Sequence, residues 1–291
     1  MTAPPIVFVN GRLAGASEAT IPALDSGFIY GDGLFETMLV RARRVVFAER
    51  HAARLAGASA ALAIPLPDSV ATADALTDLA ARLALANGLE SAPGAACRVS
   101  VSRGPRPPGP LSPPSGPPTV VAAITPAPDP GASPAPLRVG VSREIVFAPG
   151  PSTRFKTLSS LTRVLGRAEA ARRGLDDVLF VDASGLFAEA TNQNLFVLLA
   201  DGRWATPPLA SGVLPGVTRA VLLEAARGLA VEAEVRREDV ATARGACLTS
   251  APRGVVPVVS IDDRALDPAA SAPLRRFWTE RVAGPAGVGT L

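Results

Sequence analysis

The segment Arg154-Phe155-Lys156-Thr157-Leu158-Ser159-Ser160-Leu161 contains the only lysine of the 291-residue chain, whose other 28 basic residues are all arginines. Such a bias indicates a chain in which arginine serves wherever a solvated positive charge suffices. Arginine stays protonated at any workable pH, whereas a desolvated lysine can lose its proton and attack a carbonyl group to form a Schiff base. Lys156 is therefore predicted to be a catalytic nucleophile entering a helix, and a chance surface lysine is the alternative.

The composition around this lysine predicts a globular protein of two modest domains, with 48% hydrophobic and 19% charged residues. A net charge of +3 with scattered arginines gives little support to nucleic-acid binding, and no apolar run approaches the ~18 residues of a membrane helix. The N-terminal residues lack the pattern of a secretory signal, which predicts a cytoplasmic protein. Cys97 and Cys247 have no spacing typical of a disulfide or metal site, so both are expected in the core and no metal is predicted.

The first 125 residues are expected to form a small α+β domain. Its predicted strands are 6–9, 34–40, 95–102 and 120–124, with a hairpin turn at Asn10-Gly11 and helices at 51–62 and 73–86. Proline and glycine dominate residues 104–118, which predicts a long loop.

A second proline-rich stretch, 126–136, is typical of an extended linker, and it puts the domain boundary near residue 130. Residues 137–291 are then expected to form a second domain, C-terminal to the linker. Its predicted strands are 137–142, 177–181, 194–199 and 246–249, and its predicted helices are 160–173 and 218–227.

A glycine-rich segment, Asp25-Ser26-Gly27-Phe28-Ile29-Tyr30-Gly31-Asp32-Gly33-Leu34-Phe35-Glu36-Thr37, is expected to bring backbone close to another part of the chain. It resembles the N-terminal signature of the class IV aminotransferases. The resemblance continues through 47–55, and it implies that Arg54 binds the cofactor phosphate through its planar fork. His51, the only histidine, is interpreted as a helix-packing or capping residue.

Four later segments extend the resemblance to residues 6–262. The lysine segment looks like the family's Schiff-base segment, and in 185–196 Glu189 matches the glutamate that faces the pyridine nitrogen. In 212–219 the resemblance implies that Leu214 packs on the cofactor ring. It also implies that Gly216, Val217 and Thr218 form a phosphate site at a helix start, although a simple cap at Thr218 is the alternative. The turn with Ser250 and Ala251 looks like the one that completes the phosphate site.

The resemblance implies an α+β, two-domain fold type IV enzyme with pyridoxal phosphate in the interdomain cleft, a homodimer, and a small-molecule amino substrate. Three activities compete: branched-chain aminotransferase, D-amino acid aminotransferase, and 4-amino-4-deoxychorismate lyase. The turn 250–255 has alanine and Arg-Gly where many aminotransferases have threonine and an acid, which favours the lyase; Glu36 does not decide between them.

Two residues are candidates for substrate binding. Tyr30 is carried over from the glycine-rich segment, and Arg98 is the candidate for a substrate carboxylate, with a surface strand arginine as the alternative. Residues 98–102 alternate, so Arg98, Ser100 and Ser102 are expected on one face. The family's second arginine is replaced by Pro108, which puts the usual D-amino acid carboxylate site in doubt.

Overall fold

The computed structural model of the chain describes residues 5–107, 109 and 112–283. The chain forms two compact units, of which unit 1 comprises 1–129, 156–159 and 284–291 and unit 2 comprises 130–155 and 160–283. The lysine segment 156–159 thus belongs to unit 1, although it lies far along the chain. The boundaries expected from the sequence, 1–125, 126–136 and 137–291, stay a prediction, and Pro108 lies outside the described residues.

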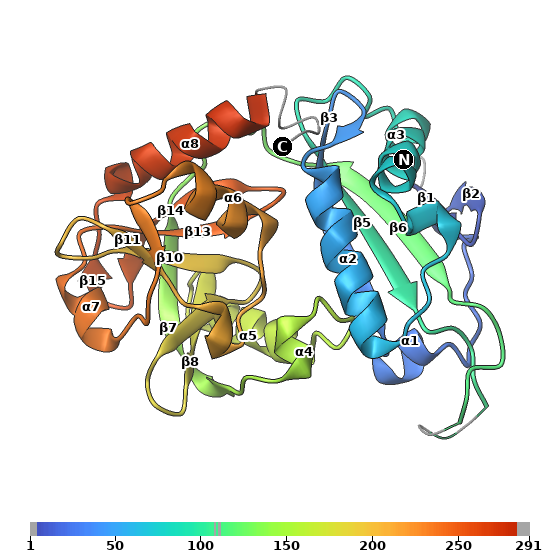
Figure 1. Ribbon diagram of the computed structural model, residues 1–291, viewed down its shortest axis with the longest axis horizontal. Helices are drawn as coiled ribbons and strands as arrows, with labels where there is room; N and C mark the ends of the chain where they lie inside the picture. The colour runs from blue at the N-terminus through green and yellow to red at the C-terminus, as the bar shows by residue number, and fades with distance from the viewer. Residues whose placement is uncertain (1–4, 108, 110–111, 284–291) are drawn as a thin grey trace. The chain divides into compact units, whose positions relative to one another are not determined.

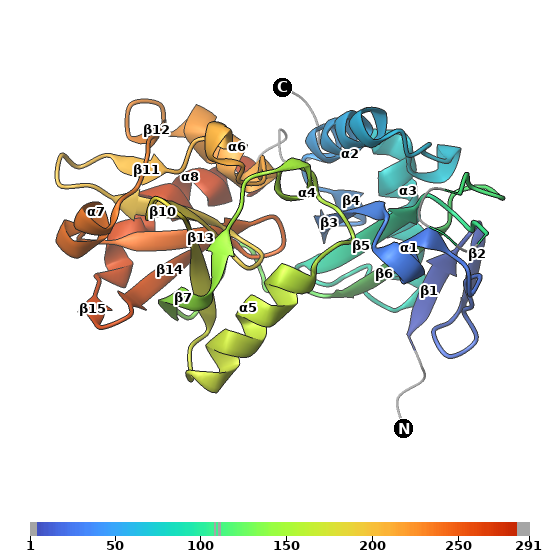
Figure 2. The same ribbon diagram turned by 90° about the horizontal axis from the view of Figure 1, so that it is seen from below.

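Unit 1 is built on a six-stranded sheet in the order β2-β1-β6-β5-β3-β4 (Figure 1). Its pairs are all antiparallel. Its strands are β1 (Ile6–Val9), β2 (Arg12–Gly15), β3 (Gly33–Arg41), β4 (Arg44–Val45), β5 (Ala95–Ser102) and β6 (Val120–Pro126), and its helices are α1 (Ser26–Tyr30), α2 (Ala48–Leu62) and α3 (Ala73–Ala86). Helices α2 and α3 contact each other and cover one face of this sheet (Figure 2).

The hydrophobic patterns explain these elements. Helix α3 begins after Thr72, whose hydroxyl accepts a hydrogen bond from the Ala75 N–H, and it buries Leu76, Leu79 and Leu83 at helical spacing. In β5 the buried residues alternate with exposed or half-buried ones up to Val101, so Arg98 and Ser100 share a face as expected.

Unit 2 contains a nine-stranded sheet that closes on itself. The order β10-β13-β14-β7-β8-β9 returns to β10 through a β9–β10 pair, and β11, β12 and β15 attach outside this ring. Its strands are β7 (Leu137–Phe147), β8 (Asp177–Asp182), β9 (Phe187–Ala190), β10 (Asn194–Leu198), β11 (Trp204–Thr206), β12 (Ala230–Glu232), β13 (Ala246–Ser250), β14 (Gly254–Ile261) and β15 (Arg264–Ala265). The buried core of the ring includes Leu195, Leu248 and Val256.

Helices pack outside this ring. Helix α5 (Leu161–Arg172) contacts β7 and β8. Helix α6 (Val217–Ala225) contacts β13, helix α8 (Ala272–Ala283) contacts β14, and the two helices contact each other. Helices α4 (Pro151–Arg154) and α7 (Arg237–Thr242) and the 3-10 turns Asp68–Val70, Leu209–Ser211 and Pro268–Ser271 complete the list of elements. Among the described residues, no helix has the length and apolar character needed to cross a membrane.

Most of the elements expected from the sequence are confirmed. Helix α3 and strands β1 and β5 have the predicted limits, and the two residues Asn10 and Gly11 join β1 to β2 with positive φ angles. Both cysteines are buried and unpaired, as expected. Helices α7 and α8 and strands β9 and β14 were not predicted.

Candidate functional site

The backbone of the lysine segment is held against strand β3. The Phe35 N–H donates to the Lys156 carbonyl at 2.8 Å, the Leu158 N–H donates to the Gly33 carbonyl at 2.9 Å, and Thr157 pairs with Leu34 as an antiparallel bridge. A strand-like pairing over three residues fixes which way each side chain points. Lys156 is therefore placed in unit 1 by main-chain hydrogen bonds to β3.

The glycine-rich segment makes this approach possible. A Cβ atom at Gly33 would lie 2.5 Å from Leu158 Cδ1, and one at Gly31 would lie 2.7 Å from Ser159 Oγ. Gly31 also has φ +66°, in the region that favours glycine. The expectation that these glycines bring backbone close to another segment is confirmed, and the segment is 158–159.

Aromatic and cationic side chains surround Lys156. Its Nζ lies 4.3 Å from the centroid of the Phe35 ring, and the Arg98 guanidinium carbon lies 3.7 Å from the same centroid. Both distances are within the range for attraction between a cation and a ring face. Arg98 is thus close to Lys156, as a substrate-carboxylate residue would have to be. Tyr30 ends α1 and is exposed, with Arg106 Cζ 5.9 Å from its ring centroid.

Arg54 is held by a buried carboxylate. Glu36 Oε1 accepts from Arg54 Nε at 2.7 Å, and Glu36 Oε2 accepts from Arg54 Nη2 at 2.6 Å. Oε2 also lies 2.8 Å from His51 Nδ1, and Glu36 is only 1% exposed. Burial alone would raise the pKa of Glu36, but Arg54 and His51 outweigh it and lower this pKa to about 2. Glu36 is therefore ionised at neutral pH.

His51 is neutral in this environment. Burial lowers its pKa, Glu36 opposes this effect, and the positive charges of Arg54 and Lys156 lower the pKa further. Its Nδ1 then carries the proton that is donated to Glu36. The helix-packing interpretation of His51 agrees with its burial, while the hydrogen bond to Glu36 was not foreseen; the N-cap of α2 is Phe47.

In unit 2 the carboxylate of Glu189 is buried and accepts three hydrogen bonds. Oε1 accepts from Arg163 Nη2 at 2.7 Å, and Oε2 accepts from Asn194 Nδ2 and from the Leu214 N–H, both at 3.1 Å. Asn194 Nδ2 also donates to the Leu214 carbonyl at 3.0 Å. These bonds fix Glu189 between strand β10 and the loop that precedes α6.

Sheet register places further polar groups beside Glu189. Asn194 lies opposite Glu189 on one side and opposite Thr249 on the other. Because directly paired residues point to the same face of a sheet, these three side chains form a row. A Cβ atom at Gly216 would overlap Asn194 Oδ1, so only glycine fits this close approach.

The start of α6 has the character of an anion site. It begins at Val217 after Gly216, which has no side chain to cap the helix. The Thr218 and Thr249 hydroxyls are buried and have no hydrogen-bond partner among the described residues. Buried hydroxyls and free helix N–H groups fit a phosphate group, which accepts several hydrogen bonds. The chemistry of these groups thus fits pyridoxal phosphate, and a buried carboxylate such as that of Glu189 is the kind of group that a protonated ring nitrogen requires.

The predicted site residues are divided between the two units. Unit 1 contains Tyr30, Arg54, Arg98 and Lys156, and unit 2 contains Glu189, Leu214, Gly216, Val217, Thr218, Ser250 and Ala251. Ser250 ends β13 and Ala251 follows in the turn to β14, both half-buried.

Sequence reasoning missed four residues in these groups. Asn194 lies in the segment 185–196, and its position at the start of the predicted strand 194–199 was a usable signal. Glu36 and Phe35 were in the glycine-rich segment without an assigned role. No sequence pattern indicated a role for Arg163, because its partner Glu189 is 26 residues away along the chain.

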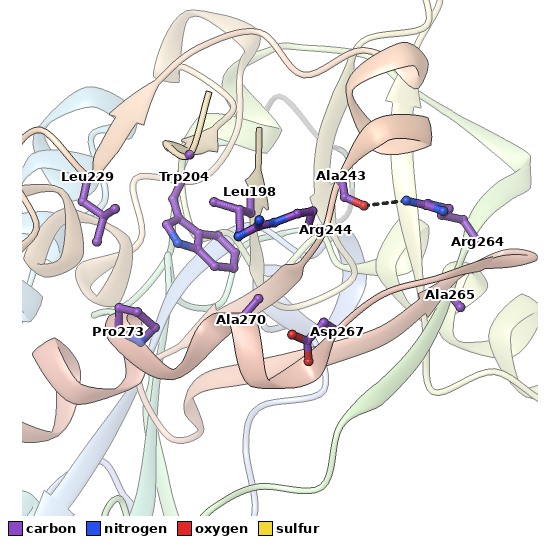
Figure 3. Close-up of a pocket in the computed structure, with 11 residues that line it drawn as sticks. Leu198, Trp204, Leu229, Ala243, Arg244, Arg264, Ala265, Asp267, Ala270 and Pro273 are labelled. Carbon is purple, nitrogen blue, oxygen red and sulfur yellow. Dashed lines mark hydrogen bonds between the residues drawn. The ribbon is translucent and has the colours of Figure 1, made fainter. Parts of the chain in front are cut away.

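A separate cavity of about 700 Å³ lies in unit 2 and contains none of the predicted residues (Figure 3). Trp204, Leu198 and Leu229 form much of its apolar wall, and Arg264 Nη2 donates to the Ala243 carbonyl at its edge. Within the described part of the chain, no group of three or more histidine, cysteine, aspartate or glutamate residues could hold a metal ion.

Comparison with known proteins gives a consistent result. Residues 33–261 match the family described as amino-transferase class IV. A protein of Methanocaldococcus jannaschii, provisionally named branched-chain-amino-acid aminotransferase, is 29% identical over 90% of this chain and 89% of its own. The bifunctional aminodeoxychorismate lyase / D-amino acid transaminase of Mycobacterium tuberculosis is 28% identical over 95% and 97%. A hypothetical aminotransferase from M. tuberculosis, solved in its PLP-bound form, is 25% identical with a TM-score of 0.81, covering 96% and 99%.

Proposed function

Since the chain belongs to the class IV aminotransferases, which are pyridoxal-phosphate enzymes, we propose that it is a 4-amino-4-deoxychorismate lyase, which forms 4-aminobenzoate and pyruvate on the folate route. The alternative within the family is an aminotransferase acting on branched-chain or D-amino acids. Relatives with both kinds of name match this chain.

The observation that favours the lyase is the turn between β13 and β14. The pair Arg253-Gly254 stands where aminotransferases often have an acid, and Gly254 has φ +62°. A Cβ atom there would overlap the Trp278 indole nitrogen. No acidic side chain can therefore be accommodated at this position without moving Trp278, which supports the lyase-like form of the turn.

The proposal gives Lys156, Glu189 and Arg98 separate roles in the reaction. Pyridoxal phosphate, when bound, supplies an aldehyde that condenses with amines and a ring that withdraws electrons from the substrate carbon. Lys156 holds the cofactor and moves the α-proton of the substrate through its Nζ. Glu189 keeps the ring nitrogen protonated, because its carboxylate is fixed by Arg163, Asn194 and Leu214. Arg98 binds a substrate carboxylate.

Two kinds of phosphate ligand are proposed. Arg54 donates charge-assisted hydrogen bonds from unit 1, as expected from the sequence. Val217 and Thr218 supply backbone and hydroxyl donors at the start of α6, and Ser250 and Ala251 complete the set. Gly216 contributes by its lack of a side chain, because its N–H already donates to the Leu214 carbonyl at 2.8 Å. Leu214 packs on the cofactor ring. The buried, unpartnered Thr218 hydroxyl supports this assignment over a simple helix cap, which would use the hydroxyl.

The decisive experiment is acceptor dependence. A lyase converts 4-amino-4-deoxychorismate to 4-aminobenzoate and pyruvate without any 2-oxo acid, whereas an aminotransferase stops after one turnover until an acceptor is added. Purified holoenzyme should release 4-aminobenzoate over many turnovers in the absence of an acceptor. If none forms, and D-alanine or L-leucine converts the cofactor to its ~330 nm amine form in a ping-pong cycle, the aminotransferase alternative replaces the lyase.

A homodimer is proposed as well, and exposed apolar side chains support it. Phe28 in α1 is 74% exposed and Leu161 in α5 is 70% exposed, with Val164 and Leu165 beside the latter. Such groups are typical of surfaces that another chain covers. Light scattering should give a mass of twice 29.7 kDa, and a monomer mass would contradict the proposal. The cytoplasmic location stays a prediction from the sequence.

A further inference from the structure

Glu36 binds Arg54 along a single edge of its guanidinium. The two hydrogen bonds use Nε and Nη2, at 2.7 and 2.6 Å, and both carboxylate oxygens take part. This two-point geometry fixes the plane of the guanidinium as well as its position. The orientation of Arg54 is therefore set by Glu36 rather than by the flexible arginine side chain itself.

His51 fixes the carboxylate from the other side. It lies three residues before Arg54 on α2, so the two side chains share a helix face. Its Nδ1 lies 2.8 Å from Glu36 Oε2, and His51 is fully buried. Because the imidazole is neutral, it adds a hydrogen bond without adding a second positive charge. The carboxylate thus has three hydrogen bonds from two residues of α2.

The negative charge of Glu36 and its role in orienting Arg54 predict opposite effects on the binding of an anion. As a negative charge beside Arg54, Glu36 weakens the attraction of any anion, so its neutralisation should tighten binding. As a group that orients Arg54, it should strengthen binding, because an arginine fixed in advance loses less freedom when it meets its ligand. A charge-neutral replacement of Glu36 therefore distinguishes the two roles by the sign of the change.

We propose that Glu36 and His51 are positioning residues that hold Arg54 ready for the phosphate monoester of the cofactor. This inference rests on the proposed role of Arg54 as a phosphate ligand. In this proposal Glu36 and His51 act through Arg54, so their effect is confined to ligands that carry a phosphate. Pyridoxal, which has the same aldehyde and ring but no phosphate, is the matched ligand that Arg54 cannot recognise.

The test measures binding of pyridoxal phosphate, pyridoxal and inorganic phosphate to the full-length protein freed of cofactor. Glu36→Gln should weaken the binding of pyridoxal phosphate and of inorganic phosphate at least ~10-fold, in line with loss of charge-assisted hydrogen bonds. The same substitution should change the affinity for pyridoxal less than ~2-fold. Glu49→Gln, in the first turn of the same helix and exposed, is the control and should change neither. Unchanged or tighter binding of phosphate ligands by a folded Glu36→Gln protein would overturn the proposal.

Variants of His51 provide a second test of the proposal if the Glu36→Gln protein does not fold. Asparagine can place an amide N–H near the position of Nδ1, so His51→Asn should stay within ~3-fold of wild type, whereas His51→Leu should lose more. Equal affinities for the two variants would contradict the role of the Nδ1 donor. In addition, His51 is the only histidine, and its imidazole ¹⁵N signals in wild-type protein should shift and saturate as inorganic phosphate is added. Signals that do not move would also overturn the proposal.

The same titrations separate this inference from the proposed function. If wild-type protein forms no ~410 to 430 nm absorbance with either pyridoxal phosphate or pyridoxal, the role of Lys156 fails. If wild-type protein reacts with both and only the Glu36 and His51 variants behave unexpectedly, the positioning role alone fails.

Discussion

Leu158 donates its backbone N–H to the Gly33 carbonyl at 2.9 Å, and a Cβ atom at residue 33 would lie 2.5 Å from Leu158 Cδ1 and 2.6 Å from the Val101 carbonyl oxygen. The Leu158 side chain and the β5 backbone therefore leave no room for a side chain at residue 33. Because Lys156 is two residues from Leu158, the same pairing with β3 fixes the backbone position of Lys156.

Gly33→Ala is expected to destabilise the protein by about 1 to 3 kcal/mol, the usual cost of overpacking, and to lower cofactor loading as 156–159 moves. Gly57→Ala is the matched control, since Gly57 lies inside α2 with no heavy atom within 4 Å of the new Cβ. It should stabilise the protein by about 1 kcal/mol through helix propensity. Urea unfolding of both variants measures the two changes, and a Gly33→Ala protein as stable as wild type would contradict the close approach.

Lys156→Arg should abolish turnover while the protein stays folded. Arginine keeps the positive charge but cannot provide a neutral amine at workable pH. Wild-type protein should absorb near ~410 to 430 nm with cofactor, and borohydride should attach the cofactor covalently to the one peptide that contains lysine. Circular dichroism checks folding. A variant that retains a tenth of the wild-type rate would exclude Lys156 from this role.

Some features of the chain could be predicted from the sequence alone. The arginine bias predicts a chemical role for Lys156, which stays a prediction, and elements such as α3 were predicted with correct limits because Thr72 caps the helix and apolar residues recur at helical spacing. Helix α8 was missed because only Leu274, Trp278 and Val282 are buried on it, a narrow apolar stripe among charged residues. The pair of Glu36 and Arg54 was also missed, because they lie on different elements and no periodic pattern relates a strand carboxylate to a helix arginine.

Arg54→Ala should weaken cofactor binding by about 2 kcal/mol or more, the range for a lost charge-assisted contact, without changing substrate preference. It should also destabilise the cofactor-free protein by about 3 to 5 kcal/mol, because Glu36 is left as a buried charge without its main partner. The double variant Arg54→Ala with Glu36→Gln should recover part of this stability. Urea unfolding and cofactor titration measure the two effects, and unchanged cofactor affinity would remove Arg54 from the phosphate site.

The buried pair of Glu36 and His51 also predicts that folding stability falls in two separate pH ranges. Burial and the neighbouring cations lower the pKa of His51 from its ordinary 6.5, so below this pH the unfolded chain takes up a proton that the folded protein does not. Stability should therefore fall as the pH drops below about 6.5, by up to about 1.4 kcal/mol per pH unit. Burial opposes the effect of Arg54 and His51 on Glu36, but these two residues lower its pKa from 4.5 to about 2. A second loss of folding stability should therefore begin below about pH 4.5.

Because His51 is the only histidine, the first window belongs to a single side chain and can be removed by one substitution. His51→Asn should give a free energy of unfolding that is nearly constant between pH 6.5 and 5 and still falls below pH 4.5, where Glu36 and other carboxylates such as Glu169, also with a lowered pKa, take up protons on unfolding. Urea titrations of cofactor-free wild type and variant at half-unit steps from pH 7 to 4 provide the comparison. A wild-type curve as flat as that of His51→Asn between pH 6.5 and 5 would mean that His51 is protonated in the folded protein, and its hydrogen bond to Glu36 would then be an ion pair rather than the neutral contact described above.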